Sequence, residues 1–151
     1  MGERIKVGQI EINYLIDGSE TDRRIGMFEF TVPPGAKVPI PHYHRDYDET
    51  VYGLSGVLTL IVDGAETEVR PGAHLFIRRG AVHHFVNRQS ESARVLAVLT
   101  PDLIGPAFFR DMGALIVPGA APDPAKMSEV MLRYGLVPVP VPQALMPLAQ
   151  T

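Results

Sequence analysis

The chain has 151 residues, with 14 lysines and arginines, 17 aspartates and glutamates and no cysteine, a size that suits one globular domain. Its share of 46% hydrophobic and 21% charged residues excludes a disordered tail protein or a coiled coil, and the lack of cysteine excludes disulfides and thiol chemistry. The formal net charge of -3 offers no polycationic surface, so we expect no nucleic acid as a partner.

The sequence also predicts no membrane association. Its apolar runs are as short as Val95 to Leu99, whereas a bilayer span needs roughly 18 apolar residues. The first residues, Met1 to Val7, lack the apolar stretch of a secretory signal. We therefore predict a cytoplasmic protein.

Glycine and proline, 14 of each, divide most of the chain into short segments typical of strands and turns. Apolar residues alternate with others over 10–16 and 28–32, which predicts half-buried strands. Residues 57–62 and 65–69 flank Asp63-Gly64, a two-residue turn that favours a hairpin. Strand patterns continue at 50–54, 83–87 and 93–99, which brings the prediction to about eight strands, enough to close a sandwich or barrel.

Two short helices are predicted after this β body. The first runs from 105 to 112 and ends at Gly113, because proline suits a first helical turn and glycine its end. The second is capped by Asp123 and ends at Gly135, and its apolar stripe should pack on the barrel. That stripe consists of Met127, Val130, Met131 and Tyr134. Beyond it, Pro138, Pro140 and Pro142 predict an extended tail, on the surface or across a neighbouring subunit.

All five histidines lie between His42 and His84. His42 and His44 are two residues apart, so on an extended chain both imidazoles project to one face and can share one ion. Glu49 stands at the start of a predicted strand and His83 begins another. A closed sheet can bring these two residues to the histidine pair.

These residues resemble the two motifs of the cupin superfamily. The first motif is matched by Gly35, His42, His44, Glu49 and Gly56, and the second by Pro71, Gly72, Gly80, His83 and Asn87. The sequence departs from the family pattern at Ala73, where an acidic residue is common, and at Arg78, where proline is common. Residues 105–109 and 123–135 resemble, more loosely, the tails of single-domain cupins grouped with quercetin dioxygenases.

The resemblance implies an all-β fold, the double-stranded β-helix (jelly-roll or cupin barrel), with one or two short C-terminal helices. The barrel would occupy residues 1–100, with its motifs at 35–56 and 71–87. Residues 101–151 would form a helical extension and proline-rich tail of the same domain. Because single cupins often pair their barrels, the resemblance also implies a homodimer.

The resemblance further implies one divalent transition metal ion (Fe, Mn, Ni, Cu or Zn) held by His42, His44, Glu49 and His83. Glu49 would also be the catalytic residue, taking a hydroxyl proton from the substrate beside the ion. Its competitor is Asp48, which would point to the opposite face of a regular strand.

Other residues near the motifs have two interpretations each. Tyr52, Phe76, Phe85 and Phe28 either line an apolar substrate pocket or belong to the core, and we name the first three as substrate-binding residues. His84 is expected in a second shell or on the surface, His74 has no predicted role, and Asn87 is expected to make a structural hydrogen bond. Arg78 and Arg79 either attract an anionic substrate or are simply solvated.

The leading functional hypothesis is a metal-dependent dioxygenase of an aromatic or enol-type small molecule, implied by the ligand set and the tail resemblance. An alternative enzyme would use the ion as a Lewis acid for isomerisation, cyclisation or hydrolysis. A third hypothesis is a non-enzymatic cupin that binds a small molecule, because fold alone does not establish chemistry.

Overall fold

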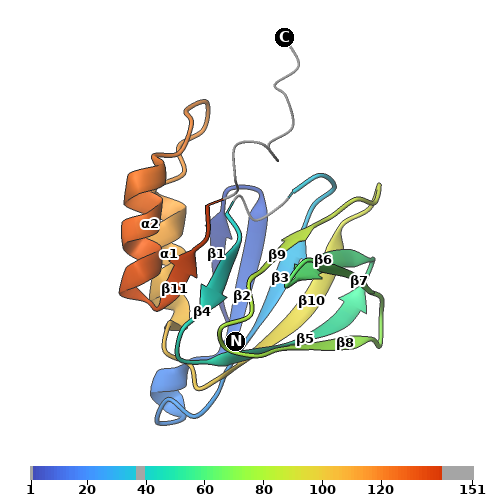
Figure 1. Cartoon of the computed structure of the whole chain (residues 1–151), viewed down its shortest axis with the longest axis horizontal. Helices are drawn as coiled ribbons and strands as arrows, with labels where there is room; N and C mark the ends of the chain where they lie inside the picture. Colours follow the sequence, from blue (N-terminus) through green and yellow to red (C-terminus); the bar gives the residue numbers. More distant parts are fainter. Residues whose placement is uncertain (1, 37–39, 141–151) are drawn as a thin grey trace.

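Two antiparallel sheets form the body of the protein (Figure 1), and the computed structural model describes residues 2–36 and 40–140. The six-stranded sheet has the order β1 (Glu3–Val7), β2 (Ile10–Ile16), β3 (Gly26–Val32), β10 (Ala93–Thr100), β5 (Asp48–Ser55) and β8 (His74–Ile77). The five-stranded sheet has the order β11 (Leu136–Pro138), β4 (His42–His44), β9 (His83–Val86), β6 (Leu58–Val62) and β7 (Ala65–Val69). This arrangement confirms the predicted all-β jelly roll.

Burial alternates along the strands as the sequence pattern predicts. In β10, Ala93, Val95, Ala97 and Leu99 are buried, while the residues between them are half-buried or exposed. A regular strand sends successive side chains to opposite faces, so one face of β10 contributes to the core. The predicted strands around 10–16, 28–32, 50–54, 83–87 and 93–99 are all present, with ends that differ by a few residues.

The hairpin predicted at Asp63-Gly64 joins β6 to β7. Both turn residues have positive φ, 48° at Asp63 and 83° at Gly64. A two-residue turn of this kind matches the right-handed twist of the flanking strands, and aspartate and glycine tolerate the conformation best.

The described part of the chain has eleven strands rather than about eight. The strands that the pattern did not predict are short or have little burial: β1 buries only Ile5, and β8 buries only Ile77. Pairing with β2 and β5, rather than an apolar alternation of their own, stabilises them. β11 is an edge strand, the position in a sheet where proline is tolerated. Pro142 lies outside the described residues.

Two α-helices lie together beside β1 and β11 (Figure 1). α1 spans Gly105–Ala114, and a 3-10 turn, η1, spans Gly18–Glu20. α1 runs one residue past the predicted stop at Gly113. That glycine allows close packing, since a Cβ there would lie 2.5 Å from the carbonyl oxygen of Lys6 in β1. Among the described residues, no helix has the length and apolar character to cross a membrane.

α2 spans Pro124–Arg133 and begins as predicted. The Asp123 carboxylate accepts hydrogen bonds from the backbone N–H groups of Ala125 and Lys126, which satisfies donors that the first helical turn leaves free. The helices join the β body in one apolar cluster. Its members include Tyr14, Phe28, Phe108, Phe109, Met112, Met127, Val130 and Met131.

Asp102 fastens α1 to the six-stranded sheet and is fully buried. Its Oδ2 accepts hydrogen bonds from the Tyr14 hydroxyl at 2.8 Å and from the Gly18 N–H at 2.9 Å. Its Oδ1 accepts from the N–H groups of Ile104 at 3.2 Å and Gly105 at 2.9 Å. Burial, together with the Asp102 carboxylate, raises the pKa of Tyr14. The start of α1 is therefore held by a fully bonded buried acid.

Candidate metal centre

Three imidazoles meet inside the body, and strand pairing brings them there. His42 and His44 lie two apart on β4, and both are buried while Tyr43 between them is half-buried. His42 is paired with His83 in the register of β4 and β9. One ring nitrogen from each histidine lies within 4.8 Å of the others, so the three rings can share one ion.

The backbone orients two of these rings. The Nδ1 of His42 lies 3.2 Å from the Ile40 carbonyl oxygen, and the Nδ1 of His83 lies 2.9 Å from the Ala81 carbonyl oxygen. An Nδ1–H that donates to a carbonyl leaves the Nε2 lone pair free for a metal, which is the usual arrangement of a metal-binding histidine.

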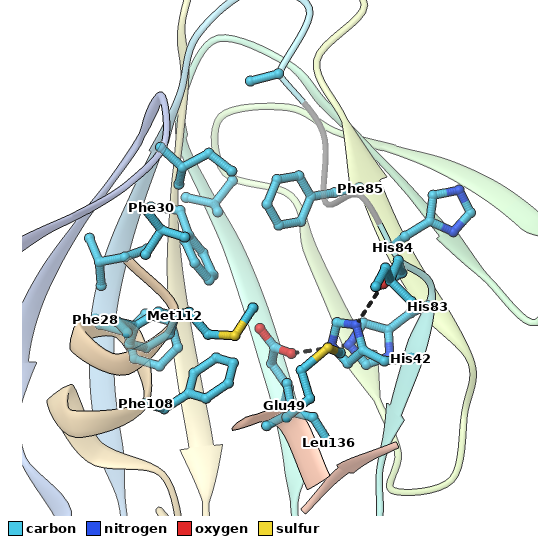
Figure 2. Close-up of a pocket in the computed structure, with 18 of the residues that line it drawn as sticks. Phe28, Phe30, His42, Glu49, His83, His84, Phe85, Phe108, Met112 and Leu136 are labelled. Atoms are coloured by element: carbon cyan, nitrogen blue, oxygen red, sulfur yellow. Dashed lines mark hydrogen bonds and ion pairs between the residues drawn. The ribbon is translucent and has the colours of Figure 1, made fainter. Parts of the chain in front are cut away.

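Glu49 brings a carboxylate to the same place (Figure 2). Its Oε2 lies 3.5 Å from Nε2 of His83 and 3.8 Å from Nδ1 of His44. The side chain is 10% exposed. Asp48, the sequence competitor, points away and accepts hydrogen bonds from the backbone and guanidinium of Arg79. The structure thus brings together all four residues named as metal ligands from the sequence.

The protonation states of His42 and His44 suit a metal site. Burial lowers the pKa of His42 to about 3 and holds the pKa of His44 well below its usual value, with the neighbouring His83 adding to both effects. Burial acts in the same direction on His83, but the hydrogen bond and charge of Glu49 outweigh it and raise the pKa of His83. His42 and His44 are therefore neutral near pH 7, as imidazole ligands must be. Three imidazoles and a carboxylate suit a divalent transition metal ion, so these residues fit the group.

A cavity of about 410 Å³ opens from this cluster toward the helices. Its wall is mostly apolar, and beside many aliphatic residues it includes the aromatic and thioether side chains of Phe28, Phe30, Phe85, Phe108, Phe109, Met112, Met127 and Met131. Figure 2 shows Phe28, Phe108 and Met112 on one side of the cavity and the histidines on the other, with Glu49 between them. An apolar cavity with a few converging polar groups is the usual form of a small-molecule site.

The structure brings one of the three predicted substrate-binding residues to the cavity. Phe85 lines it. Tyr52 and Phe76 do not, and their exposed fractions are 43% and 59%. The reason is strand alternation: their neighbours Val51 and Ile77 point inward and are buried, so Tyr52 and Phe76 face outward.

The remaining polar residues near the motifs either lie at the surface or make structural hydrogen bonds. Arg78 approaches Asp63 at 3.6 Å and Arg79 pairs with Asp48 at 3.1 Å, both at the surface. Buried Asn87 donates from its amide to the carbonyl oxygens of Val32 and Glu91, the structural role expected from the sequence.

Sequence reasoning missed several cavity residues. Phe30 comes from β3, and Phe108 and Met112 come from α1. The sequence predicted the stripe of α2 as packing on the barrel, and Met127 and Met131 of that stripe do pack there while also lining the cavity. Apolar periodicity identifies a buried face, but it does not distinguish a face that fills a core from one that lines a cavity.

The comparisons with known proteins agree on one protein family. Residues 28–99 match the model of the cupin domain. Quercetin 2,3-dioxygenase from Bacillus subtilis is 30% identical over 112 residues, which are 74% of this chain and 32% of that protein. The chain spans between 32% and 54% of the length of the curated relatives it matches.

Solved structures give the same result. A sugar phosphate isomerase of the cupin superfamily from Silicibacter pomeroyi superposes with a TM-score of 0.58 at 28% identity, covering 68% of this chain and 73% of that one. A polyketide cyclase from Streptomyces resistomycificus superposes with a TM-score of 0.57 at 28% identity, covering 67% of this chain and 75% of that one. Together with the jelly roll and the cluster of three histidines, these matches show that the chain belongs to the cupin superfamily.

Proposed function

We propose that this cupin is a metal-dependent dioxygenase that acts on an aromatic or enol-type small molecule. In this proposal one divalent ion of Fe, Mn, Ni, Cu or Zn is held by His42, His44, His83 and Glu49. The observation that carries the proposal is the position of this ligand set at one side of an apolar cavity of about 410 Å³ that several phenylalanines help to line. The similarity to a quercetin dioxygenase supports it.

The chemistry divides between the ion and the protein. A bound ion of this kind would supply a Lewis acid and, for Fe, Mn, Ni or Cu, redox chemistry with dioxygen. Glu49 would accept the proton of a substrate hydroxyl at Oε2, the oxygen that faces His44 and His83. The phenylalanines and methionines would hold the apolar body of the substrate and exclude water from the reacting end.

The charge of the lining favours an uncharged aromatic substrate over a sugar phosphate. Among the described residues that line the cavity, none is lysine or arginine. Arg78 and Arg79 are engaged with surface aspartates instead. A phosphate in the cavity would have no cationic partner there beside the proposed ion, so much of the cost of its lost hydration would stay uncompensated.

The test has two stages. Elemental mass spectrometry on protein purified without chelator should find close to one metal ion per chain. Oxygen uptake is then measured for protein loaded with each candidate metal and offered flavonols, diketones or catechols. We expect uptake above the enzyme-free control for at least one combination. Full metal occupancy with no uptake for any combination would argue against a dioxygenase.

A Lewis-acid enzyme is the second candidate, because the polyketide cyclase neighbour is 28% identical. Such an enzyme would need no dioxygen. Turnover that persists under anaerobic conditions and requires the metal would favour it over the dioxygenase. Binding of an aromatic ligand with no turnover, either in air or under anaerobic conditions, would instead indicate a small-molecule-binding cupin.

We also propose that the chain forms a homodimer in the cytoplasm, as predicted from the family resemblance. Tyr52 and Phe76 supply exposed aromatic surface on the outer face of β5 and β8, where a second copy can pack. Light scattering that gives a monomer mass would contradict the dimer.

A further inference from the structure

His44 differs from the other two histidines in how its ring is held. His42 and His83 each place Nδ1 against a backbone carbonyl two residues earlier. Among the described residues, the His44 ring has no such hydrogen bond, and its Nδ1 lies 3.8 Å from Glu49 Oε2. A metal ligand normally needs a partner that fixes its ring orientation. Something other than a carbonyl must therefore orient His44.

Tyr47 lies against the His44 ring. The two ring centroids are 4.5 Å apart and the planes are inclined by 22°, a stacked arrangement. Tyr47 follows β4 in the short connection to β5, and its side chain is fully buried. A buried ring in close-packed surroundings does not turn aside without opening a cavity. The stack therefore restricts His44 on one face.

The end of α2 holds Tyr47 in place. The Tyr47 hydroxyl lies 3.4 Å from the Tyr134 carbonyl oxygen and donates to it. The next residue, Gly135, has φ of +77° and lies against the Tyr47 ring, where an added Cβ would come within 3.7 Å of Cε1. The Arg45 N–H donates to the Gly135 carbonyl oxygen at 2.9 Å. The turn after α2 thus covers the tyrosine that stacks on the ligand.

The same turn leads into β11, which pairs with the ligand strand. Leu136 is opposite His44, and Pro138 is opposite His42. Tyr134 is also tied to α1, since its hydroxyl donates to Asp111 Oδ2 at 2.5 Å. The turn after α2 and the strand β11 are therefore in direct contact with β4, the strand that carries His42 and His44.

We propose that Tyr47 is a positioning residue that fixes the His44 imidazole for metal binding and links its geometry to the turn after α2. This inference rests on the proposed metal site. Its consequence is that changes at Tyr47 alter the coordination of the ion although Tyr47 itself supplies no ligand.

The chain offers a matched control in Tyr14. Tyr14 is also buried, at 3% exposure, and its hydroxyl is also hydrogen-bonded, to Asp102. It stacks on Phe28 at 4.9 Å and 24°, and the described cavity lining does not include it. Tyr47→Leu and Tyr14→Leu therefore remove the same aromatic group from similar surroundings, but only the first removes a stack on a ligand. Tyr47→Phe keeps the stack and removes only the hydroxyl.

The first measurement is Co(II) binding by chelator competition, with the visible spectrum of the bound ion. We expect Tyr47→Leu to weaken Co(II) binding by about 10- to 100-fold, as for other residues that orient ligands, and to change the spectrum. Tyr14→Leu and Tyr47→Phe should keep the wild-type spectrum, even where the melting temperature falls. An unchanged spectrum and affinity in Tyr47→Leu, or equal changes in Tyr14→Leu, would overturn the inference.

A second measurement needs no metal. Long-range proton–nitrogen NMR of the metal-free protein reports the tautomer and surroundings of each histidine ring. We expect one set of His44 signals in the wild type and in Tyr47→Phe, and several sets in Tyr47→Leu. If the wild type takes up no Co(II), the proposed function fails, and this spectrum still decides whether Tyr47 orients His44. A single sharp set in Tyr47→Leu would refute the positioning role.

Discussion

Different interactions hold the residues on the two sides of the cavity in place. On the ligand side, short strands carry His42, His44 and His83, and backbone carbonyls fix two of the rings. On the helix side, phenylalanine and methionine from α1 and α2 pack without directional bonds. Methionine is the most adaptable of the apolar side chains. The ligand side is therefore specified by geometry, and the helix side by volume.

This difference separates two properties of the protein that experiments can change independently. Substitutions on the ligand side should remove the metal, whereas substitutions on the helix side should change which ligands fit while the metal stays. Tyr47 links the two sides through its contacts with His44 and Tyr134, and β11 links them by pairing with β4.

The largest effect is expected from His83→Ala. It removes a proposed ligand and the ring nitrogen that lies 3.5 Å from Glu49 Oε2, so bound metal and metal-dependent turnover should both be lost. The control is His84→Ala, since Figure 2 shows the ring of His84 directed away from the ligand cluster. Elemental analysis of both variants checks the expectation. Equal metal loss in the two variants would contradict the role of His83 as a specific ligand.

The next largest effect is expected from Asp102→Ala, which releases the start of α1. The substitution strands the Tyr14 hydroxyl and the N–H groups of Gly18, Ile104 and Gly105. Because each buried unpaired group costs about 1 to 3 kcal/mol, we expect the free energy of unfolding to fall by at least about 3 kcal/mol. Urea denaturation measures it. Tyr14→Phe, which removes one of these donors, should cost much less, and equal losses would contradict the role of Asp102.

A smaller effect is expected from Met112→Ala on the helix side. Removing a buried methionine side chain costs about 2 to 5 kcal/mol, and the lower end applies because Met112 already borders a cavity. The enlarged cavity should bind bulkier aromatic ligands better, with metal content unchanged. Ligand titration and elemental analysis test both parts. Loss of the metal in this variant would show that the two sides are coupled more tightly than the packing suggests.

The smallest effect is expected from Arg110→Ala at the exposed surface of α1. Arg110 pairs with both carboxylate oxygens of Glu3 in β1, at 2.5 and 2.7 Å. Exposed ion pairs contribute little, so the denaturation midpoint should stay near that of the wild type. A shift as large as that of Asp102→Ala would mean that the surface pair, rather than the buried acid, holds the helix.

Local patterns predicted the features that depend on local geometry. The spacing of His42 and His44 fixes a common face, and Asp63-Gly64 fixes a hairpin, because both follow from strand periodicity and turn conformation. The cap of α2 at Asp123 is local in the same way.

Features that depend on tertiary packing were not predictable in this way. Whether Tyr52 faces in or out depends on the register of β5, and the presence of an aromatic residue does not determine that register. The hydrogen bond of Tyr47 to the Tyr134 carbonyl and the pairing of Leu136 with His44 join segments some ninety residues apart. No short motif encodes such contacts, so only the fold reveals them.

The pairing of β11 with β4 has a consequence for the order of synthesis. Until Leu136–Pro138 leaves the ribosome, the strand that carries His42 and His44 has β9 as its only neighbour in the sheet and remains an open edge. Translation proceeds at about 5 to 20 residues per second, so that edge is unprotected for several seconds after the strand itself is made. A nascent chain is thus exposed to wrong strand pairing at β4 during this interval.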